Sequence, residues 1–155
     1  MSNVAVDPVT NVALAQAQNV GRAAYYGAEA GLGYQLMPAL RMDANYTLTI
    51  RKNKSNPLIF LTDVPKNKVF ASVSYQPVKR VSVIASEEYN SRRYSTSYGT
   101  IAGSFYLTNA RVQIELIKGF SVDGGVNNIF DRNYQLVEGF PEAGRNYFAN
   151  LHYTF

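Results

Sequence analysis

The sequence contains no cysteine and no tryptophan, and histidine occurs only once, at His152. The absence of cysteine excludes disulfide scaffolds, thiolate metal sites, iron–sulfur clusters and thiol nucleophiles. A lone His152 leaves little material for a histidine-based metal site or a serine-protease triad. Glu87 and Glu88 are a poor acid–base couple, because neighbouring residues of a strand point to opposite faces. The sequence therefore predicts a protein that is not an enzyme and has no cofactor or metal.

Charged residues are also scarce. They make up 17% of the 155 residues, whereas about 25% is usual for a soluble globular domain. Hydrophobic residues make up 46%, which argues against disorder. Twelve tyrosines and eight phenylalanines are present, and an aromatic ring with a hydroxyl tip suits a boundary between an apolar phase and water. The length by itself is that of one domain.

The chain is basic, with 15 Lys and Arg against 11 Asp and Glu. The close basic clusters are 51–54, 79–80 and 92–93, and each lies in or beside a predicted connection. No recognition helix, RNA-binding aromatic motif or zinc finger accompanies them, so no nucleic-acid partner is predicted. No run approaches the about 18 apolar residues of a membrane-spanning helix. The first residues lack the basic and apolar regions of a secretory signal, so we expect no signal peptide in this chain.

The dominant pattern is an alternation of apolar and polar residues with a period of two, which is typical of β-strands. It covers segments 26–36, 40–50, 69–76, 81–89, 109–116, 120–127 and 146–155. The sequence therefore predicts an all-β protein, an antiparallel up-and-down meander of about seven strands. Residues 1–17 form a loop or tail, or else a poor eighth strand, because the alternation in 9–17 is weak.

The connections between these segments alternate in length. Segments 37–39, 77–80 and 117–119 are short, whereas 52–65, 90–103 and 131–145 are long and polar. Short turns at one end and long loops at the other are typical of outer-membrane β-barrels. A soluble lipocalin-like barrel or a sandwich shows the same alternation with its apolar face inward. Mid-strand charges such as Arg41, Asp43 and Arg111, together with tyrosines near the strand ends, favour a wet lumen and lipid outside.

Four motifs bear on the family. The segment from Gly144-Arg145 to Phe155 resembles the last strand of TonB-dependent outer-membrane receptors, and Val126-Asn127-Asn128-Ile129-Phe130-Asp131-Arg132-Asn133-Tyr134 resembles their Val-x-Asn-Leu-Phe-Asp-x-x-Tyr element. Asn19-Val20-Gly21-Arg22-Ala23, followed by Tyr26-Gly27-Ala28-Glu29, is similar to their Asn-x-Gly-Lys-Ala…Gly-x-Glu strand. Leu61-Thr62-Asp63-Val64-Pro65 stands where the family has a Leu-x-x-x-Pro-x-His loop end, but the histidine is absent. Together, in this order, the four motifs cover nearly the whole chain.

The resemblance implies an outer-membrane receptor that imports ferric siderophores, cobalamin or a similar nutrient with TonB energy, through a plugged barrel of about 22 strands. It implies that residues 18–155 are the carboxy-terminal barrel segment and that this chain has no plug domain. We therefore expect no transport by the chain alone. The expected partners are outer-membrane lipid, the barrel-assembly machinery and the remainder of the barrel or plug, with TonB contacted only through a region amino-terminal to the barrel. The alternative is a small self-contained outer-membrane or lipid-binding barrel with a structural role.

Two groups of side chains are candidates for function. The first, Leu151, Tyr153 and Phe155, is similar to the terminal signal that the barrel-assembly machinery reads, and an ordinary lipid-facing strand is the alternative. The second is a set of basic residues that are candidate ligand contacts for an anionic ligand. It consists of Arg51, Lys52, Arg92, Arg93 and Arg145. Solvated loop charge is the alternative for the first four of these.

Several other residues have structural interpretations. Arg145 has the alternative of pairing with the carboxylate of Glu142 or Asp131. Asn127, Asn128 and Asp131 are expected to organise the turn that follows their strand, because Asn and Asp side chains bond nearby backbone. The paired glycines 124–125 mark a bend or close packing within a strand. His152 is expected on the polar side of the last strand.

Overall fold

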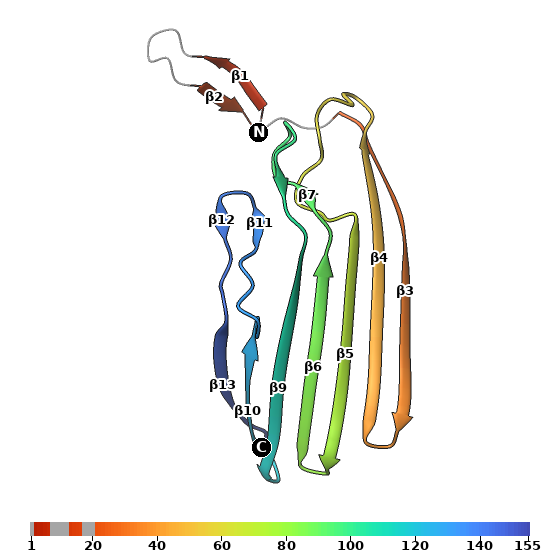
Figure 1. Ribbon diagram of the computed structural model, residues 1–155, viewed down its shortest axis with the longest axis vertical. Helices are drawn as coiled ribbons and strands as arrows, with labels where there is room; N and C mark the ends of the chain where they lie inside the picture. Colours follow the sequence, from red (N-terminus) through yellow and green to blue (C-terminus); the bar gives the residue numbers. More distant parts are fainter. Residues whose placement is uncertain (1, 7–12, 17–20) are drawn as a thin grey trace.

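The computed structural model describes residues 2–6, 13–16 and 21–155, with side chains described from residue 21 onward. All of its regular elements are strands, as the sequence predicts. Seven long strands form one antiparallel sheet in the order β13-β10-β9-β6-β5-β4-β3 (Figure 1). They are β3 (Ala23–Met37), β4 (Leu40–Asn53), β5 (Asn67–Val78), β6 (Val81–Asn90), β9 (Phe105–Ile117), β10 (Phe120–Asn127) and β13 (Asn146–Tyr153). Among the described residues there is no helix able to span a membrane.

The shorter strands lie outside this sheet. β1 (Ser2–Val6) and β2 (Ala13–Gln16) pair with each other as a separate hairpin and do not extend the large sheet. Residues 7–12 and 17, the rest of the proposed eighth strand, lie outside the described residues. The pairs β7 (Arg93–Tyr94) with β8 (Ile101–Ala102) and β11 (Gln135–Val137) with β12 (Phe140–Pro141) lie within long connections. These short pairs were not predicted, since two or three residues carry no detectable alternation.

The connections confirm the predicted alternation of length. Three tight turns join β3 to β4, β5 to β6, and β9 to β10 at one end of the sheet (Figure 1). Gly119 in the last of these turns has φ +82°, and a Cβ there would lie 2.6 Å from the carbonyl oxygen of Thr154. The opposite end carries the first long loop (54–66), the second long loop (91–104) and the third long loop (128–145).

The pairing register keeps apolar residues on one face across the whole sheet. Tyr46, Val69, Tyr89 and Tyr106 are cross-strand neighbours on β4, β5, β6 and β9. We call this the apolar face. The opposite, polar face carries the row Asp43, Ser72, Ser86 and Asn109 on the same four strands. The period of two along each strand therefore becomes two chemically distinct surfaces, because the pairing preserves the side-chain direction from strand to strand.

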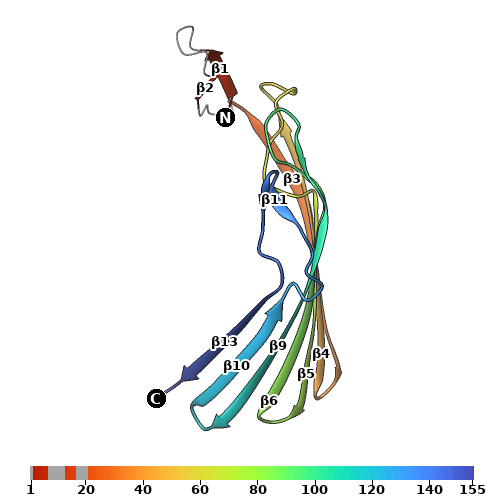
Figure 2. The ribbon, with the colours of Figure 1, turned by 60° about the vertical axis from the view of Figure 1, so that its left-hand side comes forward.

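Within the part of the chain that the structure describes, no protein layer packs on the apolar face. Figure 2 shows one curved sheet, and among residues 21–155 only Ala102 and Phe105 are fully buried hydrophobic residues. Leu32 and Leu151 on this face are 70% and 71% exposed. A sandwich or lipocalin-like barrel would bury such side chains in a packed core. The sheet also does not close on itself, because β3 and β13 are its two edges and do not pair with each other.

Glu87 and Glu88 lie on opposite faces, as the alternation predicts. Thr108 Oγ1 donates a hydrogen bond to Glu87, whereas Glu88 accepts a hydrogen bond from Asn90 and lies 3.1 Å from Lys68 Nζ.

The paired glycines 124–125 provide close packing, the second of the two expected roles. A Cβ at Gly125 would lie 2.8 Å from the Phe148 ring, so the missing side chain makes room for that ring.

Candidate functional site

The three long loops are joined to one another by side-chain contacts. The Phe60 and Tyr94 rings stack with centroids 4.0 Å apart, which connects the first loop to the second. Ser95 Oγ accepts a 2.7 Å hydrogen bond from the backbone N–H of Glu138, which connects the second loop to the third. Residues far apart in the sequence therefore form one connected loop layer at this end of the sheet.

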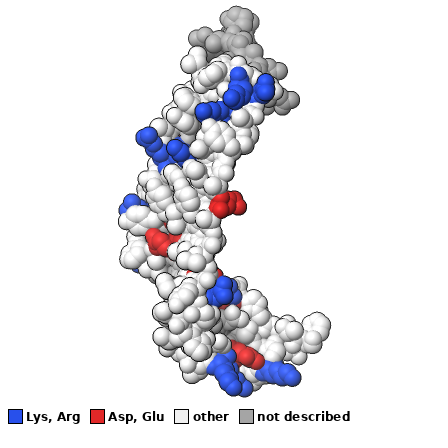
Figure 3. Space-filling model, turned by 90° about the vertical axis from the view of Figure 1, so that its right-hand side faces the viewer, with Lys and Arg blue, Asp and Glu red and all other residues white. Residues whose placement is uncertain are grey.

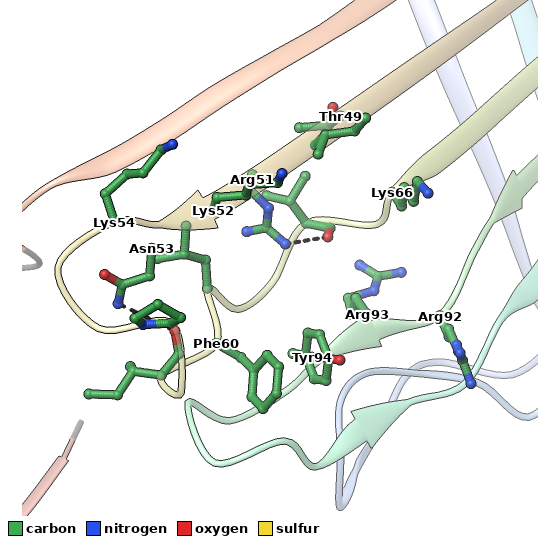
Figure 4. Close-up of a pocket in the computed structure, with 15 residues that line it drawn as sticks. Thr49, Arg51, Lys52, Asn53, Lys54, Phe60, Lys66, Arg92, Arg93 and Tyr94 are labelled. Carbon is green, nitrogen blue, oxygen red and sulfur yellow. Dashed lines mark hydrogen bonds between the residues drawn. The ribbon is translucent and has the colours of Figure 1, made fainter.

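A basic pocket of about 600 Å³ lies between the end of β4, the first long loop and β7. Its charged lining comes from three segments of the chain and consists of Arg51, Lys52, Lys54, Lys66, Arg92 and Arg93 (Figure 4). Figure 3 shows that basic side chains gather near this end of the molecule, with a second group at the opposite end. Four of the five basic residues singled out from the sequence as ligand contacts therefore lie in one place.

Arg51 is a brace of the first loop. Its Nη1 and Nη2 donate hydrogen bonds of 2.5 Å to the backbone carbonyls of Thr62 and Val64. Since the guanidinium is used in holding loop carbonyls, Arg51 contributes to the pocket its shape and its positive charge. Asn53 also holds the first loop in place. Its side-chain amide donates to the carbonyl of Ile59, and its side-chain oxygen accepts from two loop N–H groups.

Arg93 is the buried cation of the pocket, with only 7% of its surface exposed. Its guanidinium lies over the Phe105 ring, 5.3 Å from the centroid. Burial lowers the pKa of Arg93 from its ordinary value, while the charges of Asp63 and Glu88 oppose that shift. Within the described part of the chain, Nε and Nη2 of Arg93 have no hydrogen-bond partner.

Lys52 and Arg92 differ from Arg93 in their surroundings. Both are exposed, and Lys52 Nζ lies 5.8 Å from the centre of the Tyr26 ring. Lys66 was not singled out from the sequence. It follows Pro65 directly, at the point where the first loop returns to the sheet, and no sequence pattern links it to the basic residues of the other two segments that line the pocket. The pocket therefore combines exposed cations at its edge with one buried cation.

Arg145 does not line the pocket. Its backbone N–H donates a 2.8 Å hydrogen bond to Asp131 Oδ1, so the contact with Asp131 involves its backbone. Asn128 organises the same turn, because its side-chain oxygen accepts from the Arg132 N–H and its amide donates to the Arg132 and Ala143 carbonyls. These contacts confirm the turn-forming role expected for Asn128 and Asp131. The side-chain amide of Asn127 instead reaches β13 and donates to Asn146.

Asp123 is the centre of a polar cluster on the polar face. Its side chain is almost fully buried, and it contacts Arg111 Nε at 3.2 Å, the Asn150 amide at 3.2 Å, and the His152 ring. The cluster joins β9, β10 and β13. His152 thus lies on the polar face as predicted, and its ring is engaged with a strand partner.

The family model described as "TonB dependent receptor-like, beta-barrel" matches residues 2–129, most of the chain. The chain belongs to this family. The TonB-dependent receptors are non-enzymatic, and they are outer-membrane β-barrel proteins. The Heme/hemopexin utilization protein C of Haemophilus influenzae is 29% identical over 169 residues, which cover 99% of this chain and 23% of that protein.

Solved TonB-dependent receptors share the fold. The chain is similar to the ferric enterobactin receptor of Pseudomonas aeruginosa, with a TM-score of 0.77 and 20% identity over 94% of this chain and 24% of that chain. The siderophore receptor PiuA of Acinetobacter baumannii gives a TM-score of 0.71 and 19% identity over 96% and 23% of the two chains. The chain thus spans about a quarter of the length of these relatives.

Leu151 and Tyr153 lie on the apolar face of β13, opposite Val122 and Phe120 of β10. Both are exposed, and the Tyr153 ring lies 6.0 Å from the ring of Phe155. The strand ends at Tyr153, two residues before the end of the predicted segment, although the Thr154 N–H still donates to the Gly119 carbonyl. In this TonB-dependent receptor segment, β13 is an edge strand whose second side has no partner within the large sheet.

Proposed function

We propose that this chain forms the carboxy-terminal part of the barrel wall of an outer-membrane receptor that imports a scarce nutrient, such as a ferric siderophore, with TonB energy. In this proposal, residues 18–155 are the barrel segment and residues 1–17 belong to the preceding connection. The plug and the remaining strands come from outside this chain, and TonB acts through that other part. Transport is therefore expected only from the assembled receptor.

One observation carries the proposal: a continuous, uncovered apolar face opposite a continuous polar face. Burial of apolar area is worth about 25 cal/mol per Å², so an exposed wall of this kind is costly in water. Lipid covers such a face at no cost, and the polar face then lines a wet lumen. Tyrosines at both ends of the apolar face, such as Tyr89 and Tyr153, suit the two membrane interfaces.

The absence of cysteine allows a direct test with single spin labels. We would label Val112→Cys on the apolar face and the matched neighbour Gln113→Cys on the polar face, in the chain refolded into phospholipid liposomes. The proposal expects high accessibility to oxygen for the label at 112 and high accessibility to a water-soluble nickel complex for the label at 113. Equal accessibility of both labels to the nickel complex would contradict a lipid-facing wall.

We further propose that Leu151, Tyr153 and Phe155 are read by the barrel-assembly machinery. Their support is that Leu151 and Tyr153 alternate along an edge strand, where a partner strand can add by backbone pairing, and that Phe155 follows this strand with its ring beside that of Tyr153. Phe155→Ala in the exported receptor is expected to lower its amount in the outer membrane, whereas Thr154→Ala is expected to leave it unchanged. Equal amounts of the two variants in the outer membrane would mean that the three residues are only part of an ordinary lipid-facing wall.

The basic loop residues are proposed to attract an anionic ligand toward the lumen. Lys52 and Arg92 are exposed at the pocket edge, so they act by long-range attraction that salt screens. Arg51 contributes its charge while bracing the loop, and Arg145 lies outside the pocket, so its contribution is limited to long-range charge. Lys52→Gln together with Arg92→Gln should slow ligand association at low salt and have little effect at high salt.

A further inference from the structure

We propose that a groove on the apolar face beside Glu87 binds the acyl chain of a phosphorylated membrane lipid, and that Glu87 accepts a hydrogen bond from a hydroxyl group on that chain. The inference rests on the proposed function for the statement that this face lies in lipid. It goes beyond a lipid-facing wall, because it assigns one place on the wall to one lipid chemistry.

Glu87 is the only acidic side chain on the apolar face of the seven long strands, all of which the structure describes. Its cross-strand neighbours are Ala71 on β5 and Thr108 on β9. The other acidic residues of these strands lie on the polar face and are Glu29, Asp43, Glu88, Glu115 and Asp123. An ionisable side chain that faces hydrocarbon is costly, so its presence there indicates a function.

Glu87 has one oxygen free to accept a hydrogen bond. Thr108 Oγ1 donates to Glu87 Oε2. Within the described part of the chain, no donor bonds to Oε1 of Glu87 and no Lys, Arg or His forms an ion pair with it. In hydrocarbon no water can serve this oxygen, so a donor carried by a lipid would lower the cost of its position.

The nearest row of tyrosines gives the depth of Glu87 in the membrane. Tyr89 lies two residues nearer the long loops on the same strand, and Tyr46 and Tyr106 belong to its row. Such a row suits the membrane interface. Two residues span about 7 Å along a strand, and the tilt of a barrel strand reduces this to a depth of about 5 Å. Glu87 therefore lies just inside the hydrocarbon layer, where the first carbons of an acyl chain lie.

The groove beside Glu87 has a volume of about 470 Å³, which is in the range of small-molecule sites. Ala44, Ala71 and Ala85 line it, and their short side chains leave the space that forms the groove. The larger, exposed side chains of Leu32 and Met42 border it. A groove of this shape holds one chain in place, whereas a flat wall contacts all acyl chains alike.

The groove descends from Glu87 toward the membrane interior. One row of cross-strand neighbours consists of Tyr34, Met42, Val73, Ala85, Ala110, Val126 and Tyr147. It joins Tyr34, three residues before the short-turn end of β3, to Tyr147 at the loop end of β13. Rows therefore slope from the loop end toward the turn end as they cross from β13 to β3. The groove runs the same way, from Thr108 and Glu87 to Leu32, so its polar end is its outer end.

A cation marks the membrane interface at this outer end. The guanidinium of the exposed Arg132 lies over the Tyr106 ring, 4.4 Å from the centroid, and Arg132 Nη1 donates a 3.3 Å hydrogen bond to the Tyr106 hydroxyl. Tyr106 and Thr108 are neighbours on the same face of β9. A lipid phosphate at Arg132 thus places the first carbons of its acyl chain beside Glu87. A hydroxyl group on these carbons meets Oε1 in a medium of low dielectric, where a hydrogen bond is strong.

The test uses the full 155-residue chain in detergent micelles and two lysophosphatidates that differ in one group. One carries a β-hydroxymyristoyl chain and the other a plain myristoyl chain. Native mass spectrometry of the chain with an equimolar mixture measures which lipid is retained. The hydroxylated lipid is expected to be retained about threefold or more over the plain one, the effect of one hydrogen bond. Equal retention, or a lipid-free dimer of the chain, would overturn the proposal.

The decisive variant is Glu87→Leu, which keeps the size of the side chain and removes the acceptor. It is expected to retain the two lipids equally. The matched control is the adjacent Glu88→Gln on the polar face, which should keep the preference of the unmodified chain. An unchanged preference in Glu87→Leu would contradict the assignment of the hydroxyl to this side chain.

A second pair of variants tests the groove itself. Ala71→Phe fills the groove and is expected to lower the retention of both lipids by about threefold or more. Ala30→Phe adds the same ring on the apolar face outside the groove lining and should have little effect. Equal effects of the two would exclude the groove as the binding site. Val112, the labelled position of the lipid-accessibility experiment, also lies outside this lining, so the two proposals can fail separately.

Discussion

Asp131 Oδ1 accepts a hydrogen bond from the backbone N–H of Arg145 at 2.8 Å, and this contact closes the third long loop at its base. The two residues belong to two separate sequence motifs of the TonB-dependent receptors. Gly144 also lies close to Asp131, since a Cβ at Gly144 would be 2.6 Å from the same Asp131 oxygen. The Gly-Arg pair and the Asn-x-x-Asp element thus form one structural unit that starts the last strand.

Asp131→Ala should therefore loosen the base of the third loop. The expected loss is about 0.5–1.5 kcal/mol of folding free energy, the usual net contribution of one hydrogen bond, because the two residues are exposed and water can replace the lost acceptor. Urea unfolding in detergent, followed by circular dichroism, measures it. Glu138→Gln is the control, because Glu138 in the same loop contacts Ser95 through its backbone N–H. A loss of stability as large in the control would contradict this explanation.

Asp123→Ala should weaken the attachment of β13. Asp123 is 3% exposed and binds Arg111 of β9 and both Asn150 and His152 of β13. The expected cost is about 1–3 kcal/mol, because the partners lose a common charged acceptor and are themselves partly exposed to water. Hydrogen exchange of the β13 amides should increase. Asp43→Ala is the matched control, since Asp43 pairs with exposed Arg41 on its own strand, and unchanged β13 exchange in both variants would exclude the proposed role of Asp123.

Gly125→Val should prevent normal packing of the last three strands. Its Cβ would lie 2.4 Å from the Ala110 carbonyl oxygen and 2.8 Å from the Phe148 ring, so the backbone or the ring must move. Overpacking of this kind typically costs about 1–3 kcal/mol. The fraction of folded protein on an unheated detergent gel should fall. Gly103→Ala is the control, because a Cβ at position 103 meets nothing within 4 Å; a stable Gly125→Val protein would show that the ring relocates freely.

Alkaline pH should loosen the contact between Tyr134 of the third long loop and Phe105 at the start of β9. Burial, with the negative charges of Glu142 and Glu88, raises the pKa of the Tyr134 phenol above its ordinary value of 10.0. A raised pKa means that the folded state favours the neutral phenol, so this contribution is complete below the pKa of the unfolded chain and is lost as pH rises through the folded value.

An ultraviolet titration of phenolate formation checks this prediction. The absorbance change of the component with the highest pKa should become smaller in Tyr134→Phe, because this variant lacks the Tyr134 phenol. Its ring still packs against Phe105. The same substitution at exposed Tyr147 should leave that component in place. Retention of the component in Tyr134→Phe would assign the raised pKa to another tyrosine.

The sequence by itself determined the strands, their faces and the end of the sheet that carries the long loops. The reason is geometric, because side chains alternate strictly along a strand and a meander places consecutive strands side by side. The tertiary structure decided what the loop residues do. Arg92 and Arg93 are neighbours of the same charge, yet one is exposed and the other is buried over Phe105. Loops have no periodicity from which such a difference can be read, since it arises from contacts between segments far apart in the chain, such as Phe60 with Tyr94.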